Sequence, residues 1–113
     1  MGRKNIGGVI EFFKVEVSRN FEAISQFYTY PVETYWNESY LSKKELRKSY
    51  GAAWSRNIKS NNLITFIMAY GSGSEYHVTT KFTYKRKGET EEKTTLNNLT
   101  MKFNEEGKIR SIK

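Results

Sequence analysis

The spacing of apolar residues changes from a helical to an alternating period near Asn61. Over residues 6–18, apolar side chains recur every three or four positions, which predicts an amphipathic helix with Asn5 as its cap. A shorter helix is predicted over residues 21–28, begun by Asn20, and Pro31 ends it. Residues 32–36 then favour a strand, and residues 37–39 a turn. The stripe of the first helix expected to face the core is Ile6, Val9, Ile10, Phe13 and Val17.

A third helix is predicted to begin at Ser42, where Ser-Lys-Lys-Glu forms a capping box with Glu45. In such a box each side chain satisfies a backbone N–H group that the first helical turn leaves without a partner. The polar residues 57–62 are expected to end this helix. Its buried stripe is predicted to be Leu46, Tyr50, Ala53 and Trp54.

Strand patterns dominate the second half of the chain. Residues 63–70 are apolar on both faces, and residues 76–85 alternate strictly between apolar and polar types. A long strand ending at Phe103 and a short one over 108–113 follow, with turns predicted at 71–74, 87–89 and 104–107. This order predicts one α+β domain over residues 1–113, with three N-terminal helices packed in a curved, mostly antiparallel sheet.

Composition narrows the chemistry that this domain can carry out. The chain has no Cys and one His, and all 12 of its acidic residues are Glu. Disulfides, thiolate nucleophiles and Asp–His pairs are therefore excluded, and no spacing of metal ligands is present, so we expect no metal and no cofactor. The formal net charge is +7, but the basic residues are scattered, and the cluster at 85–87 is followed by glutamates. This pattern does not favour a nucleic-acid partner.

Four stretches of the chain carry a resemblance to a known fold family. They are residues 21–28, residues 31–36, residues 41–46 followed by Tyr50 and Trp54, and residues 98–103 followed by 107–109. In this order they resemble the nuclear transport factor 2-like superfamily, whose cone-shaped fold is cystatin-like, in the style of small bacterial members. The resemblance implies a curved sheet around the first helix and a pocket at the open end of the cone. It implies either enzymes, such as isomerases, dehydratases and polyketide cyclases, or non-catalytic binding and dimerising domains.

The resemblance transfers no catalytic residue, because the enzymatic branches commonly use an Asp base and this chain has none. It does suggest a ligand pocket lined by Tyr28, Glu33, Tyr35, Trp36, Tyr50 and Trp54. Glu33 would lie near the mouth, where burial among aromatic rings could make it an acid or base, or it could simply be solvated. Tyr50 and Trp54 are expected to fill the core, whereas Tyr35 and Trp36 suit either role.

The single histidine is expected to be structural rather than catalytic. Alternation places His77 with Lys81 and Lys85 on the outer face of the sheet, away from the cone. Glu75 is the nearest acid in sequence, and at two residues along the strand we expect it to pair with His77 only indirectly.

These observations favour a non-catalytic domain that binds a small apolar or amphipathic ligand, or a partner. The alternatives are an isomerase- or dehydratase-like enzyme that uses a pocket Glu, and a scaffold or interaction domain of a larger assembly. Because both faces of residues 63–70 are apolar, we expect a homodimer that covers the outer sheet face. The chain shows no apolar run long enough for a membrane span and no leader, which favours the cytoplasm.

Overall fold

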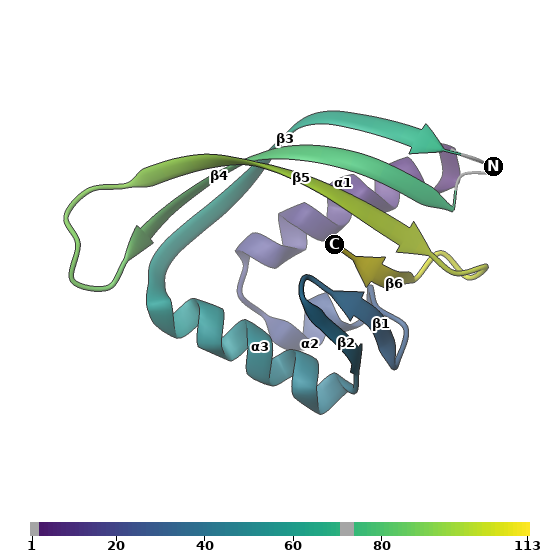
Figure 1. The fold of residues 1–113 in the computed structure, drawn as a ribbon, viewed down its shortest axis with the longest axis horizontal. Coiled ribbons are helices and arrows are strands. Elements are labelled where there is room, and N and C mark those ends of the chain that lie inside the picture. The colour runs from purple at the N-terminus through teal and green to yellow at the C-terminus, as the bar shows by residue number, and fades with distance from the viewer. Residues whose placement is uncertain (1–2, 71–73) are drawn as a thin grey trace.

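The computed structural model describes residues 3–70 and 74–113, which form three helices and six strands (Figure 1). In chain order the elements are α1 (Arg3–Val17), α2 (Phe21–Ser25), β1 (Val32–Tyr35), β2 (Glu38–Leu41), α3 (Lys43–Arg56), β3 (Asn57–Tyr70), β4 (Glu75–Arg86), β5 (Lys93–Phe103) and β6 (Ile109–Ile112). Among these residues, no helix has both the length and the apolar character needed to cross a membrane.

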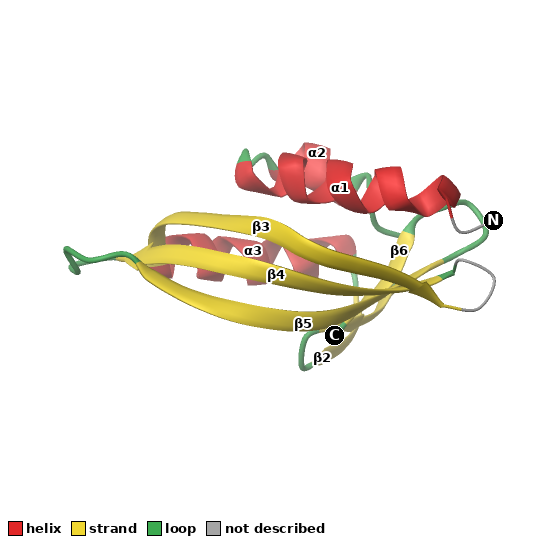
Figure 2. Ribbon diagram, turned by 90° about the horizontal axis from the view of Figure 1, so that it is seen from above, coloured by secondary structure: helices red, strands yellow, loops and turns green. Residues whose placement is uncertain are grey.

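The six strands form one mixed sheet in the order β2-β1-β6-β5-β4-β3. Neighbouring strands are antiparallel except β1 and β6, which are parallel. The long strands β3, β4 and β5 arch over α1, while α3 lies along the open side of the arch (Figure 1). Seen from above, α1 follows the direction of these strands (Figure 2). The predicted α+β class and the curved, mostly antiparallel sheet are confirmed.

Helix α1 packs into the sheet by a stripe that differs from the predicted one. Val9, Phe12 and Phe13 are buried, whereas Ile10 is 40% exposed and Val17 is 46% exposed. The predicted stripe was wrong about these last two residues because the helix is rotated toward Phe12. Since positions i, i+3, i+4 and i+7 share one helix face, this stripe continues to Glu16, which is half-buried. The predicted cap residue, Asn5, lies inside α1 rather than before it.

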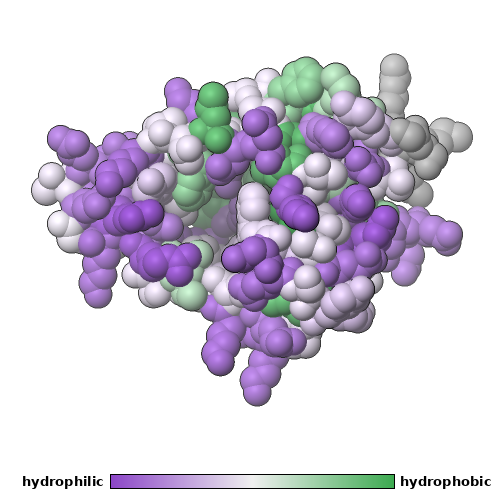
Figure 3. Space-filling model, in the orientation of Figure 1, coloured by the Kyte–Doolittle hydropathy of each residue, from purple (hydrophilic) through white to green (hydrophobic). Residues whose placement is uncertain are grey.

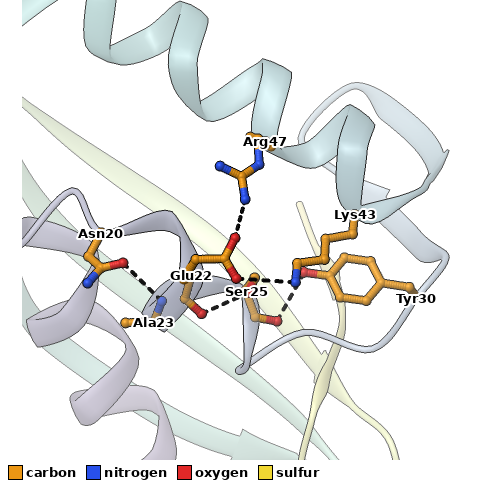
Figure 4. Close-up of polar contacts among 7 residues, drawn as sticks. All are labelled: Asn20, Glu22, Ala23, Ser25, Tyr30, Lys43 and Arg47. Carbon is orange, nitrogen blue, oxygen red and sulfur yellow. Dashed lines mark hydrogen bonds and ion pairs between the residues drawn. The ribbon is translucent and has the colours of Figure 1, made fainter.

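Helix α2 is capped as predicted but ends after Ser25, earlier than the predicted position 28. The Asn20 side chain accepts a hydrogen bond from the backbone N–H of Ala23 at 3.3 Å. Glu22 then reaches across to α3, where it pairs with Lys43 and Arg47 (Figure 4). These contacts hold the short helix against the first two turns of α3.

Helix α3 begins with the predicted capping box. The Ser42 hydroxyl accepts from the backbone N–H of Glu45 at 3.2 Å, and the Glu45 carboxylate accepts from that of Ser42 at 3.0 Å. No loop follows the helix, because β3 begins at Asn57, immediately after Arg56. Residues 57–62 therefore end the helix as predicted, but they belong to β3, whose predicted start was residue 63.

Strand pairing explains why two polar segments, residues 57–62 and residues 38–39, form strands that the sequence did not predict. Residues 57–62 pair with the far half of β4, so main-chain hydrogen bonds outweigh the low strand propensity of asparagine. The predicted turn at 37–39 is likewise part of a hairpin, in which Glu38 pairs with Tyr35 and Ser39 with Thr34.

The remaining turns and the alternation of β4 agree with the sequence pattern. Gly88 and Gly107 take left-handed backbone conformations, with φ of 85° and 78°, in the turns predicted at 87–89 and 104–107. Tyr76, Val78 and Thr80 are buried on the inner face of β4. Of the turn predicted at 71–74, residues 71–73 lie outside the described residues.

Candidate functional site

A cavity of about 280 Å³ lies in the concavity of the sheet, between α1, α3 and the strands β3, β4 and β5. The molecular surface is hollowed on this side, with apolar residues visible inside the hollow and hydrophilic residues around it (Figure 3). The apolar wall consists of Phe12, Phe13, Val17, Tyr35, Trp36, Tyr50, Ala53, Trp54, Phe82, Leu99 and Ile112. The polar lining consists of Glu16, Arg56, Asn57, Ser60, Asn61, Asn62, Thr80 and Asn97.

Glu16 is the one carboxyl group among the residues that line this cavity. Its Oε2 accepts a hydrogen bond from the Tyr50 hydroxyl at 2.7 Å, and its Oε1 accepts one from the Asn62 side-chain amide at 3.4 Å. The three residues come from α1, α3 and β3. The carboxyl group is therefore held in place by one partner on each of two other elements.

A second tyrosine extends this contact into the core. The hydroxyls of Tyr28 and Tyr50 lie 2.8 Å apart, and both side chains are buried. A phenol has one proton to donate, and that of Tyr50 is directed to Glu16. Tyr28 must therefore donate to Tyr50. The result is a chain of hydrogen bonds that runs from Tyr28 through Tyr50 to the Glu16 carboxylate.

Burial shifts the pKa values of the residues that form this hydrogen-bonded chain and of the neighbouring Tyr35. It raises the pKa of Glu16, and the hydrogen bonds from Tyr50 and Asn62 only partly oppose this effect. Burial also raises the pKa values of Tyr28 and Tyr50 well above the ordinary phenol value, and raises that of Tyr35. The three phenols hence keep their protons near neutral pH.

The first half of β3 supplies a polar wall opposite the aromatic one. Asn57, Ser60, Asn61 and Asn62 all line the cavity. Two buried oxygens in the lining, Asn57 Oδ1 and Thr80 Oγ1, have no hydrogen-bond partner among the described residues. Buried polar atoms without partners are unfavourable for folding, so a water molecule or a ligand in the cavity would stabilise these two oxygens by supplying hydrogen bonds.

The structure brings four of the six predicted pocket residues to the cavity. Tyr35, Trp36, Tyr50 and Trp54 line it, with ring centroids of Tyr50 lying 5.5 Å from Tyr35 and 5.4 Å from Trp54. Tyr50 is buried as expected of a core residue, yet it also borders the cavity. Tyr28 lies behind Tyr50 and does not line the cavity itself.

Glu33 is not in the cavity, so its place among the predicted pocket residues was wrong. It lies exposed on β1, and its carboxylate pairs with the Arg110 guanidinium of β6 at 2.9 Å. Alternation along β1 puts Glu33 on the face opposite the buried Val32, and its side chain is exposed.

His77 lies on the outer face of the sheet, as predicted. The expectation that it would pair with Glu75 only indirectly was wrong. Its Nε2 is 2.9 Å from the Glu75 carboxylate, so the two residues pair directly. Side chains two positions apart on a strand lean toward each other here, and the Tyr70 ring covers His77 at 4.0 Å between centroids. Among the described residues, no group of three His or Glu side chains could hold a metal ion.

The sequence pattern indicates the position of Glu16, although the prediction of pocket residues did not include it. Glu16 stands seven positions after Val9, on the same face as Phe12 and Phe13. An acidic residue in the fourth position of an apolar stripe indicates a buried carboxyl group. Asn62 and Arg56 carried no comparable signal, because their placement depends on β3 starting directly after α3.

No protein-family model and no curated protein matches the sequence. Solved structures do match the fold. SalBIII, an epoxide hydrolase/cyclase-like enzyme in pyran ring formation in the polyether salinomycin, is 14% identical with a TM-score of 0.82, over 97% of this chain and 88% of its own. PrhC from Penicillium brasilianum is 14% identical with a TM-score of 0.82, over 98% and 78%. An NTF2-like protein of unknown function from an Exiguobacterium species is 12% identical with a TM-score of 0.75, over 92% of both chains.

Other matched structures carry the provisional names hydroxylase, polyketide cyclase and scytalone dehydratase. At these identities the likeness establishes the fold and nothing further. The chain has the nuclear transport factor 2-like fold, also called the cystatin fold, which confirms the resemblance found in the sequence.

The raised pKa of Glu16 makes stability depend on pH in a defined direction. The folded protein holds this proton more tightly than the unfolded chain, whose ordinary value is 4.5. The stability that Glu16 contributes is therefore fully present below that value and is lost as the pH rises through the raised pKa. Glu16→Gln removes this loss, so its stability relative to the wild type should rise between about pH 4 and pH 8 in urea unfolding.

The exposed Glu33→Gln serves as the matched control and should show no such upward trend. A stability difference for Glu16→Gln that stays constant or falls with pH would contradict the burial of this carboxyl group.

Proposed function

We propose that the cavity binds a small, planar, mainly apolar molecule that carries a hydrogen-bonding group at one end. The observation that carries the proposal is the Glu16 carboxylate, which is fixed inside an aromatic cavity by Tyr50 and Asn62. An apolar pocket with a few convergent polar groups is the usual form of a small-molecule site. The cavity volume of about 280 Å³ suits a ligand of one or two rings.

The walls match the two parts of such a ligand. Tyr35, Trp36 and Trp54 present ring surfaces, against which an aromatic ligand gains contact area and favourable ring–ring geometry. Glu16 accepts a hydrogen bond from a donor on the ligand, and the nearby amides can donate to an acceptor. The unpartnered oxygens of Asn57 and Thr80 support the same assignment.

Acid–base catalysis on the bound molecule is the second candidate function. Glu16 has a raised pKa and lines the aromatic cavity, so its carboxyl group can exchange a proton with a molecule bound there. A carboxyl group in this environment can take a proton from an acidic C–H bond or return one. Several structures of the same fold are named as enzymes, which supports this candidate by analogy only.

Binding can be measured directly, because both tryptophans of the chain line the cavity. We expect one- and two-ring compounds such as 2-naphthol and 2-tetralone to change tryptophan fluorescence and to raise the melting temperature. Ala53→Phe fills the cavity and should weaken binding by about tenfold or more. Ser55→Phe, at an exposed position of α3 that lines neither this cavity nor the groove beside it, should bind like the wild type.

Equal binding by both variants, or no binding by the wild type, would contradict the proposal. The ketone 2-tetralone also separates the two candidate functions. If Glu16 is a base, the protein accelerates exchange of the ketone's α-hydrogens in D₂O, and Glu16→Gln abolishes this acceleration. If the domain only binds, the exchange rate equals that of the free ketone.

The proposal includes a homodimer formed through the outer sheet face. Five large apolar side chains there are between 43% and 66% exposed: Leu63, Phe66, Met68, Tyr70 and Leu96. Strand register sets these residues of β3 and β5 beside the outward-facing side of β4. About half of the residues of these three long strands face outward, close to the roughly 20 residues a side of a stable interface. Monomers rarely leave an apolar surface of this extent uncovered.

Phe66→Glu should therefore give a monomer in sedimentation equilibrium at roughly tens of micromolar protein, where the wild type is a dimer. Ser55→Glu adds the same charge on α3, away from the sheet face, and should leave the dimer intact. A wild-type chain that sediments as a monomer at this concentration would refute the dimer.

A further inference from the structure

The cavity has a second charged residue, and its guanidinium group has no internal partner. Arg56 is the last residue of α3, is exposed, and lines the cavity. It forms no ion pair or side-chain hydrogen bond with the described residues, and its backbone carbonyl accepts from Lys87 at 3.0 Å. Most other charged groups beside this helix are engaged with protein partners. Arg56 is thus free to bind something that the chain itself does not supply.

Helix capping does not account for this arginine. A cation in the last turn of a helix often binds the terminal carbonyl groups. Here that position is taken by Arg19, whose guanidinium donates to the carbonyl of Asn57 at 2.7 Å and to that of Trp54 at 3.4 Å. Because Arg19 already serves the end of α3, Arg56 is not needed there.

Arg56 stands where the cavity opens to the surface. A groove between the β1–β2 hairpin and α3 adjoins the cavity, and the two share Tyr35, Trp36, Ala53 and Arg56 in their linings. Trp36 is 42% exposed and has a left-handed backbone with φ of 56°, which is uncommon for a bulky residue. Its backbone N–H donates to the carbonyl of Ile112 at 2.8 Å, which fixes the residue at this opening.

The carboxylates of the groove are already engaged by protein partners. Glu38 accepts hydrogen bonds from Ser49 at 3.1 Å and 3.2 Å, and Glu45 is held in the capping box with Ser42. Lys48 lies on the same side and offsets part of their negative charge. Within the cavity lining itself, the charged residues are Glu16 at the inner end and Arg56 at the mouth.

From this arrangement we infer that the site takes a small aromatic carboxylate that carries a hydroxyl group at its opposite end. The inference rests on the proposed binding function and names its ligand class. Arg56 binds the carboxylate at the mouth, because a guanidinium matches a carboxylate with two parallel hydrogen bonds. The ring system lies between Trp36 and Trp54, and the hydroxyl donates to Glu16. A ligand with two carboxylates would place one of them against Glu16, so the second polar group must be a neutral donor.

The test compares 6-hydroxy-2-naphthoate with its neutral amide, 6-hydroxy-2-naphthamide, by calorimetry and tryptophan fluorescence. The wild type should bind the carboxylate about tenfold more tightly than the amide, and added salt should reduce this preference. Arg56→Gln should weaken carboxylate binding by about tenfold and leave amide binding unchanged. Arg56→Lys keeps the charge but not the paired hydrogen bonds, and should fall between the two.

Lys44→Gln is the matched control, because it removes one positive charge from an exposed position of the same helix outside the cavity and the groove. It should bind both compounds like the wild type. Equal affinity of the wild type for the two compounds, or equal loss of both in Arg56→Gln, would overturn the role of Arg56 while leaving the binding site intact. Failure of both compounds to bind the wild type would instead overturn the binding function itself.

Discussion

A carboxyl group on the inner face of α1 is the constraint around which the site is organised. Glu16 occupies the fourth position of the stripe that begins at Val9, so packing of the helix carries it toward the core. A buried charged group without partners costs more than the roughly 1–3 kcal/mol of a neutral one. Tyr50 and Asn62 supply the partners from α3 and β3. The hydrogen bonds to Glu16 therefore join α1, α3 and β3, and the same carboxyl group forms the polar end of the cavity.

The polar wall of the cavity depends on the way in which β3 leaves α3. The strand begins directly after Arg56, and Arg19 ties the loop after α1 to the junction through the carbonyl of Asn57. Register shifts against β4 at 57/59 and 64/66 interrupt the regular pairing, and such bulges bend a strand. The polar first half of β3 consequently borders the cavity, while Ile64 and Ile67 in its second half pack against the core.

Features set by local chemistry could be predicted from the sequence, and features set by distant pairing could not. The capping box at Ser42 and the alternation of β4 depend on neighbouring residues, and both were correct. Residues 57–62 have the composition of a loop and become a strand only because β4 pairs with them. The resemblance suggested four aromatic residues that line the cavity, but Glu16 was not considered, because the stripe of α1 was judged without Phe12. The prediction of a domain that binds without catalysis rested on the lack of Asp, Cys and metal-ligand spacing and on the outward position of the one His. None of these observations bears on what a buried Glu can do.

The most direct test of this account is the titration of Glu16 followed by the ¹³C NMR signal of its side-chain carboxyl group. Since the chain has no Asp, every side-chain carboxyl signal belongs to one of its 12 glutamates, and Glu16→Gln assigns the relevant one. The account predicts a midpoint above the ordinary 4.5, and a still higher one in Tyr50→Phe, because the hydrogen bond from Tyr50 lowers the pKa of Glu16. A midpoint at or below 4.5, or one that Tyr50→Phe leaves unchanged, would contradict it.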